Sequence, residues 1–278
     1  MKFLVNFLLF LLFSFNIVKP ISDEPIFILH SYHPEFRWTT FESNGIRSAL
    51  FKEKYKGSIY IEYLDTKNFN YNEIAPICEE IIEKKYKKFD FKIVICTDND
   101  AFNFVKTYGD KLFPNAYFVF SGINGFEDSM VPDRNKYTGI AELIDFEANI
   151  KGILKVFPKT KEIVSFFDNT VSGKQILKDY QNAISKVNIK GVKFPNIINP
   201  TIAELLDTVS VLKDGQILLQ GELGKDRNGE VFNHMDISML LSQVSRVPIW
   251  GTINDMLRKG IIGGHLYSAF YSGRFAGE

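Results

Sequence analysis

Short apolar runs that suit buried parallel strands alternate along this chain with longer stretches of helical periodicity. The first run is Ile26–Ser31, and the next two are Ser58–Leu64 and Phe91–Cys96. Strands separated by helices predict βαβ units and therefore parallel sheets. Because the pattern continues to about ten strands, which is large for one open sheet, we expect an α/β fold of two Rossmann-like, doubly wound lobes with a cleft between them.

The later strands and the helix starts can be placed from the same pattern. Further strands are expected at 116–121, 137–141, 162–167, 191–195, 216–220, 248–250 and 261–263. Capping residues are expected at the starts of four helices, namely Thr39, Asp98, Asp145 and Thr201. The two threonines each precede a glutamate by three residues, which is the capping-box pattern. For the two aspartates, capping outweighs ligand contact.

The joint between the lobes is expected near Thr138–Glu142. Residues 23–139 would then form the N-terminal lobe and 140–262 the C-terminal lobe, with 263–278 crossing back to the first lobe. The sequence ends inside an expected helix that begins near Ser268. No C-cap signal follows except Gly277, so a fragment or a truncated product is expected.

The first 22 residues read as an export signal. Lys2 is followed by a stretch to Val18 that is apolar except for two asparagines and a serine. This length suits a signal peptide and falls short of the ~20 apolar residues that span a membrane. An uncleaved N-terminal anchor is the alternative, because Ser22 offers only a weak cleavage site. No cysteine follows the leader, so a lipoprotein is not expected, and the protein is predicted to be periplasmic or extracytoplasmic.

Charge and cysteine content exclude some classes of function. Lys and Arg number 33, as do Asp and Glu, so there is no electrostatic case for nucleic-acid binding. Cys78 and Cys96 are the only cysteines. An exported protein could oxidise them, although two reduced core residues are the favoured interpretation.

Polar and aromatic residues gather at the predicted strand ends, where open α/β sheets bind ligands. The candidates are Ser31, Tyr32, His33, Trp38, Asp65, Asp98, Asn99, Ser121, Asn124, Asp168, Gly221 and Asp255. Lys67 and Ser172 belong to the same strand-end segments. Aromatic rings, amides and carboxylates together suit a small polar or zwitterionic organic ligand. Trp38 could instead hold its loop against the first helix.

Catalytic and metal signatures are missing from the sequence. His30 and His33 have metal-ligand spacing, but a zinc site needs three or four ligands and the other histidines lie far along the chain. No nucleophile elbow, phosphate-binding loop or dinucleotide fingerprint occurs. No metal or cofactor is therefore expected. An exported α/β hydrolase, with His33 or His265 as its base, is the less favoured alternative.

Several segments together resemble a known family. The matching stretches are Leu29–His33, Arg37–Thr39, Glu62–Lys67, Thr97–Phe102, Leu112–Pro114, Val119–Asn124, Tyr137–Gly139, Lys225–Gly229 and Gly260–Gly264. In these stretches the chain resembles the substrate-binding proteins of ABC transporters, which also occur as extracytoplasmic sensor domains of bacterial histidine kinases and diguanylate cyclases. The resemblance covers nearly all of residues 26–278.

The resemblance implies a periplasmic-binding-protein-like fold whose lobes close on a small, amino acid-like ligand. It implies no catalysis by this chain. The segments Ser31–His33 and Glu62–Lys67 favour the sensor domain of a membrane signalling protein over a transporter's solute receptor. The expected partner is then a downstream signalling module, or alternatively an ABC permease. The family pattern continues past Tyr271–Glu278, so a kinase or cyclase module would lie beyond residue 278.

Overall fold

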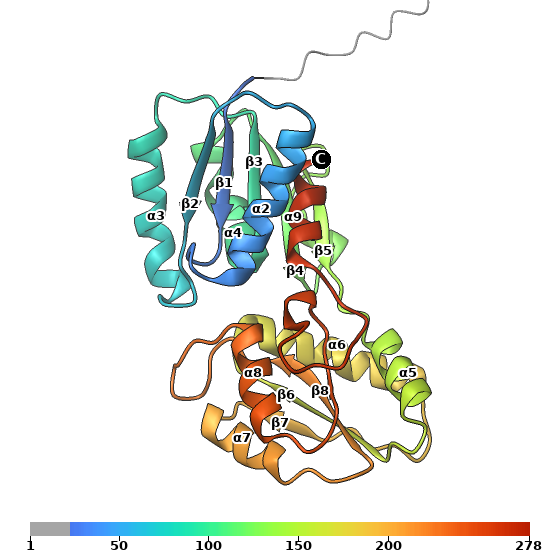
Figure 1. The fold of residues 1–278 in the computed structure, drawn as a ribbon. Coiled ribbons are helices and arrows are strands. Elements are labelled where there is room, and N and C mark those ends of the chain that lie inside the picture. The colour runs from blue at the N-terminus through green and yellow to red at the C-terminus, as the bar shows by residue number, and fades with distance from the viewer. Residues whose placement is uncertain (1–22) are drawn as a thin grey trace, which may run out of the picture.

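The computed structural model describes residues 23–278, which form two α/β lobes, each built on one parallel sheet (Figure 1). The predicted signal segment 1–22 lies outside the described residues. Within 23–278, no helix has the length and apolar character needed to span a membrane.

The first lobe contains a five-stranded sheet of order β2-β1-β3-β4-β5. Its elements are β1 (Ile26–His30), α2 (Arg37–Lys52), β2 (Ile59–Tyr63), α3 (Tyr71–Tyr86), β3 (Ile93–Thr97), α4 (Asp98–Leu112), β4 (Tyr117–Asn124), the 3-10 turn η1 (Asp128–Met130) and β5 (Tyr137–Glu142). Strand β1 is fully buried because helices cover both faces of the sheet. Phe27 and Leu29 point into the core beneath α3 and α4, whereas Ile28 packs with Ile46 on the α2 side.

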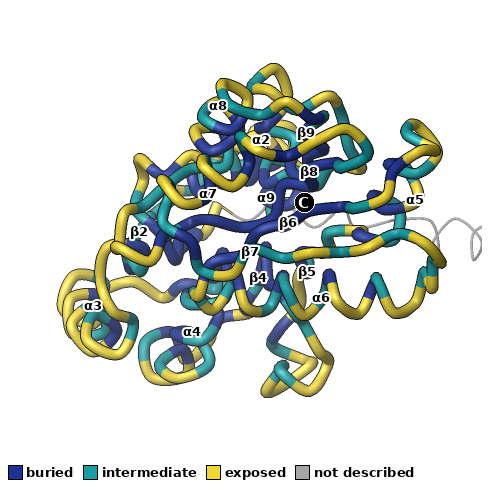
Figure 2. The backbone as a smooth tube through the Cα atoms, turned by 90° about the horizontal axis from the view of Figure 1, so that it is seen from below, coloured by how far each residue is buried: buried dark blue, intermediate teal, exposed yellow. Residues whose placement is uncertain are grey.

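The second lobe contains a four-stranded sheet of order β7-β6-β8-β9. Its elements are α5 (Phe146–Val156), β6 (Glu162–Phe167), α6 (Val171–Val187), β7 (Asn196–Ile198), α7 (Ile202–Ser210), β8 (Gln216–Glu222), α8 (His234–Val244), β9 (Ile249–Trp250) and the 3-10 turn η2 (Asn254–Met256). Helices α5 and α6 cover one face of this sheet, and α7 and α8 cover the other. Figure 2 shows buried strands enclosed by helices whose outer surfaces are exposed.

The last helix, α9 (Ala269–Gly277), returns to the first lobe and packs along α2 (Figure 1). Two glycines let the helix backbones approach closely. A Cβ on Gly45 would lie 2.0 Å from the carbonyl oxygen of Phe270, and one on Gly273 would lie 2.1 Å from that of Glu42. The chain thus leaves the first lobe after β5 and comes back to it before α9.

Two strand predictions for the second lobe are wrong. The predicted strand 191–195 contributes one isolated bridge, between Lys193 and Glu162, and the strand itself begins five residues later, where β7 pairs Asn196 with Ser165 of β6. Pro195 has no N–H to donate to a ladder and only accepts a bond from Ser165 at the strand's start. The predicted strand 261–263 contributes one isolated bridge, between Gly263 and Trp250, so this sheet has four strands.

Two of the four capping predictions are also wrong. Helix α2 begins at Arg37 after Phe36, and Thr39 is buried inside its first turn instead of capping it. Asp98 is the first residue of α4, at φ 65°, with Thr97 in the N-cap position and no side-chain cap bond. The other two predictions are confirmed. Asp145 accepts from the Ala148 N–H, and Thr201 forms a complete capping box with its glutamate.

Candidate ligand-binding site between the lobes

A small cavity lies between the carboxyl ends of the two sheets. Its volume is about 20 Å³, room for roughly one water molecule. Both lobes line it, through Tyr32, Phe36, Trp38, Lys67, Asp98, Asn124, Glu142, Ser172, Ile176, Glu222 and His234. Side chains therefore fill most of the space between lobes that are closed on each other.

The cavity adjoins a larger hollow of about 500 Å³. Tyr32, Lys67 and Ser172 border both spaces, so the two are neighbours. Asp100 of the first lobe and Lys225 of the second lobe also line the larger hollow. The inner cavity therefore has a polar hollow beside it.

An aromatic wall, consisting of Tyr32, Phe36 and Trp38, covers the first-lobe side. All three belong to the segment after β1, where the chain turns into α2. The Trp38 ring stacks on Tyr267 at 5.9 Å, and its Nε1 donates to Oδ1 of Asp98 at 3.0 Å. Trp38 therefore lies in the first turn of α2 itself, contacts Asp98 of α4 and Tyr267, and lines the cavity, instead of holding its loop against the first helix.

An acidic floor, consisting of Glu42, Asp98 and Glu142, lies below this wall. The carboxyls come from α2, α4 and β5, and each residue is at most 5% exposed. Ser121 donates to Glu42 Oε1 at 3.0 Å, and Asn124 donates to Glu142 Oε2 at 3.2 Å. Among the described residues, Oε2 of Glu42 and Oδ2 of Asp98 have no hydrogen-bond partner.

Burial raises the pKa of every carboxyl of the acidic floor. It raises the pKa of Asp98 to about 7, a rise that the charge of Lys67 partly offsets. Burial, together with neighbouring carboxylates, raises the pKa of Glu42 and Glu142 well above the ordinary value. A proton held by Glu42 or Asp98 supplies a donor for the two unpartnered oxygens.

A buried ion pair forms the second-lobe side. Glu222 ends β8, and its Oε2 lies 2.8 Å from Nε2 of His234 at the start of α8. Burial lowers the pKa of His234, but Glu222 outweighs it and raises the pKa to about 9. Burial likewise would raise the pKa of Glu222, and His234 instead lowers it. The pair is ionised at neutral pH.

Lys67 extends from the first lobe across the cleft. Its Nζ lies 4.5 Å from the ring centroid of Tyr32 and 5.2 Å from that of Phe36. A Cβ on Gly224 of the second lobe would lie 2.7 Å from the same Nζ and 2.9 Å from Oε1 of Glu222. The ammonium is therefore held between the aromatic wall and a carboxylate of the opposite lobe.

The residues predicted from the sequence fall into three groups. Tyr32, Trp38, Asp98 and Asn124 line the cavity. Asp98 was predicted to cap its helix in preference to contacting a ligand. In the structure it makes no cap bond and lines the cavity.

Residues of the second group do not line the cavity but form hydrogen bonds with the segments around it. The hydroxyl of Ser31 donates to the Thr97 carbonyl at 2.7 Å and accepts from the Ala101 N–H at 2.8 Å. Asn99 exchanges two hydrogen bonds with the backbone of Asn124, and Ser121 holds Glu42.

On the second lobe, Asp168 plays the same supporting part. Its Oδ2 accepts from the N–H groups of Gly224 and Lys225, at 2.8 and 3.1 Å. These bonds fix the loop that passes beside Lys67.

The third group does not border the cavity. His33 contacts the ring of Phe36 from outside, and Asp65 accepts from Asn68 within its own turn. Gly221 is embedded in β8, where a Cβ would lie 2.0 Å from the Phe166 carbonyl oxygen. Asp255 lies behind His234, whose pKa its charge helps to raise, and its buried Oδ1 has no partner among the described residues.

Several lining residues were not predicted as site residues. Glu142 and Glu222 end β5 and β8, one and two residues beyond the predicted strand ends, so correct strand ends would have identified them. Phe36 lies inside the loop that was singled out. No sequence signal indicated Ile176 or the pairing of His234 with Glu222.

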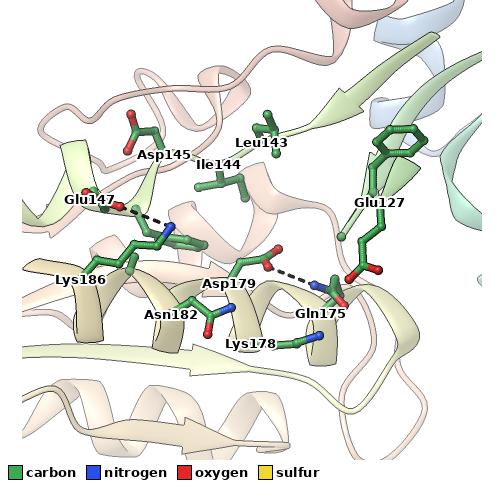
Figure 3. A pocket seen from close by; sticks show the side chains of 14 residues that line it. Glu127, Leu143, Ile144, Asp145, Glu147, Gln175, Lys178, Asp179, Asn182 and Lys186 are labelled. Carbon is green, nitrogen blue, oxygen red and sulfur yellow. Dashed lines mark hydrogen bonds and ion pairs between the residues drawn. The ribbon is translucent and has the colours of Figure 1, made fainter. Parts of the chain in front are cut away.

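A second hollow lies beside the connection from β5 to α5 and has a volume of about 310 Å³. Figure 3 shows its lining side chains, which come mainly from that connection and from α6. Lys186 pairs with Glu147 at 3.8 Å, and Gln175 donates to Asp179 at 3.0 Å. The Lys186–Glu147 pair is partly exposed, in contrast to the buried pair of Glu222 and His234 in the cavity between the lobes.

Neither a disulfide bond nor a metal site is present within residues 23–278. Cys78 and Cys96 are both unbonded, and Cys96 is buried. In the same range, no three His, Cys, Asp or Glu side chains are grouped so as to hold a metal ion.

Comparison with known proteins identifies the fold. No protein-family model and no curated protein matches the chain. The ABC domain from Streptococcus pneumonia in complex with L-Trp matches it with a TM-score of 0.65 and 14% identity, covering 92% of this chain and 83% of that one.

Two ABC transporter solute-binding proteins match similarly. The one from Bacillus halodurans C-125 with bound myo-inositol has a TM-score of 0.57 at 9% identity, covering 94% and 88% of the two chains. The one from Clostridium phytofermentas with bound L-rhamnose has a TM-score of 0.55 at 9% identity, covering 92% and 79%. At such identities the likeness is one of fold. This chain has the two-lobed α/β fold of periplasmic binding proteins.

Proposed function

We propose that this protein is an extracytoplasmic binding module that takes up a small polar organic ligand between its lobes. The observation that carries the proposal is the cavity at the carboxyl ends of both sheets, lined from both lobes by aromatic, amide and charged side chains. The similar solved structures, which hold L-Trp, myo-inositol or L-rhamnose, support ligand binding by this fold. Of the twelve ligand-binding residues predicted from the sequence, we propose that Tyr32, Trp38, Asp98 and Asn124 contact the ligand, because these four line the cavity.

The cleft is proposed to bind without catalysis. A hydrolase would need a base beside a nucleophile. His234 is the histidine that lines the cavity, and its pKa of about 9 keeps it protonated at neutral pH. His33 and His265, the bases considered from the sequence, do not border the cavity.

The biological context that we propose is the sensor end of a membrane signalling protein, in which lobe closure is the signal. The segments Ser31–His33 and Glu62–Lys67 support this role through their resemblance to sensor domains. A solute receptor for an ABC permease is the second candidate, and it is favoured by the solved structures that the fold matches. A pull-down from membranes separates the two, since a receptor recovers its permease and a sensor does not.

Thermal unfolding of the full chain tests the binding proposal. The chain is heated with amines, amino acids, short carboxylates, polyols and sugars. A ligand at a hundredfold excess over its dissociation constant stabilises the folded state by about 2.7 kcal/mol, so one chemical class is expected to raise the Tm clearly.

Two variants test whether the rise in Tm comes from binding in the cleft. Trp38→Phe keeps an aromatic ring but loses the bond to Asp98, and it should weaken ligand binding. Gln175→Ala, in the hollow of Figure 3, should leave binding unchanged. Cooperative unfolding with no shift for any class would refute the proposed function.

A further inference from the structure

The ammonium group of Lys67 lies against the aromatic wall. It lies over two aromatic rings, at 4.5 Å from the centroid of Tyr32 and 5.2 Å from that of Phe36. Aromatic faces attract cations within about 6 Å, and quaternary and primary ammonium groups are bound in this way. The side chain is 7% exposed, so the charge is almost removed from water.

Lys67 is the cation of the cavity lining that has no carboxylate paired with it. Glu222 is paired with His234. That leaves Asp98 and Glu142 as carboxyls of the lining, and Lys67 as its remaining cation. If the ammonium moved away, these two buried carboxyls would lose the cation beside them, and each would need its own proton or another cation in its place.

One carboxylate oxygen is already without a hydrogen-bond partner. Asp98 is 2% exposed and lines the cavity, and its Oδ2 accepts no bond from any described residue. Its Oδ1 is held by Trp38, which fixes the orientation of the carboxyl. A proton shared between Asp98 and Glu42 bridges the two carboxyls, and once a bound cation displaces that proton the Asp98 carboxylate can accept from an N–H donor.

Lys67 also has space to move. It borders both the inner cavity and the adjoining hollow of about 500 Å³. Its backbone is anchored by the neighbouring Thr66, whose N–H donates to the Ser31 carbonyl at 2.9 Å. Rotation of the flexible side chain can therefore bring the ammonium into the hollow without displacing the loop.

Resting on the proposed function, we propose that the aromatic wall and the acidic floor form a subsite for the ammonium group of an organic amine, and that Lys67 occupies this subsite until such a ligand displaces it. The ligand class is a cationic amine without a carboxylate. A carboxylate placed beside Lys67 would also meet the ionised carboxylate of Glu222, and two like charges at this depth repel each other.

Titration calorimetry of the full chain tests this with paired probes. Agmatine, tyramine and choline are each compared with the carboxylated counterpart, which is arginine, tyrosine or betaine. At least one amine is expected to bind, and more tightly than its counterpart. Lys67→Met should tighten amine binding about tenfold, because the competing ammonium is gone.

Two further variants keep the result interpretable. Lys67→Gln also removes the charge and should tighten binding in the same way if the methionine variant fails to fold. Lys106→Met is the matched control, since Lys106 also lies over a ring, at 4.7 Å from Phe102, and does not line the cavity. It should leave amine binding unchanged.

The possible outcomes separate this inference from the proposed function. Tighter binding of arginine, tyrosine or betaine than of the amines, or weaker amine binding in Lys67→Met and Lys67→Gln, would overturn the ammonium subsite and make Lys67 a carboxylate-binding residue. Binding only of polyols or sugars would overturn it too, while the binding module itself would stand. If no small molecule of any charge binds, the proposed function fails as well.

Discussion

At the scale of single residues, the protonation of Asp98 links stability to pH. The pKa of Asp98 is about 7 in the folded state and 3.8 in the unfolded chain. This contribution to stability is therefore fully present below about pH 4 and is lost as pH rises to 7. The facing groups that share in this balance are Glu42, Lys67, Asp100, Glu142, Tyr32 and Tyr267.

Asp98→Asn tests that link. Asparagine resembles the protonated carboxyl, so the variant should be more stable than the natural chain at pH 8, by a few kcal/mol at most. Its stability should also fall less between pH 5 and pH 8, as measured by urea unfolding. Asp207→Asn, at an exposed position, serves as the control. An identical pH dependence for Asp98→Asn and the natural chain would contradict the assignment.

The pair of Glu222 and His234 has a different pH window. Because the pKa of His234 is raised to about 9 and that of Glu222 is lowered from 4.5, the stability from this pair is complete between about pH 4.5 and 6.5. It is lost as pH rises through 9, and also as pH falls through the lowered pKa of Glu222. Glu222→Gln leaves a buried imidazolium without its partner, which typically costs about 3–5 kcal/mol. An NMR titration of the imidazole should then give a clearly lower pKa for His234. An unchanged value would mean that Glu222 does not set it.

At the scale of elements, the contact of α2 with α9 depends on small residues. Gly45→Ala would place a Cβ 2.0 Å from a backbone oxygen of the facing helix, which cannot move alone. The helices must separate, and we expect a loss of about 1–3 kcal/mol or more. Chemical denaturation measures this loss, with Ser48→Ala on the exposed face of α2 as the control. A loss within 0.5 kcal/mol would show that the helices adjust freely.

Much of the element order could be predicted because strand and helix periodicities differ. What failed were features that depend on burial in three dimensions. Thr39 and Thr201 precede glutamates at the same spacing, yet only Thr201 forms a capping box, because Glu42 is drawn into the interior at the cleft. On α3, Ile77 and Ile81 stand four residues apart, as on a buried helical face, yet they are 53% and 44% exposed.

The candidate site could be predicted in part for the same reason. Rings and polar groups after strands, such as Tyr32, Trp38 and Asn124, follow from the rule for open sheets. Glu142 and Glu222 were missed because the predicted strands ended early. The closeness of Lys67 to Glu222 arises only when the lobes meet, which no local pattern in one sequence encodes.

At the scale of the whole molecule, ligand binding should release protons. A cationic ligand lowers the pKa of Asp98 and its neighbours, so the protons that they hold near pH 7 leave on binding. Affinity for an amine should therefore rise between pH 6 and pH 8. Calorimetry in two buffers of different ionisation enthalpy measures the protons released. Proton uptake, or none at all, would contradict a cation-binding cleft.

The return of α9 to the first lobe has a mechanical consequence. Residue 23 precedes β1 and residue 278 follows α9, so both belong to the same rigid half of the molecule (Figure 1). When the lobes swing apart, the span between these two residues stays constant, and only the second lobe travels relative to them. Under the proposed function, ligand occupancy would be reported by movement of the second lobe, which contains Glu222 and His234, relative to the first lobe, which contains residues 23 and 278.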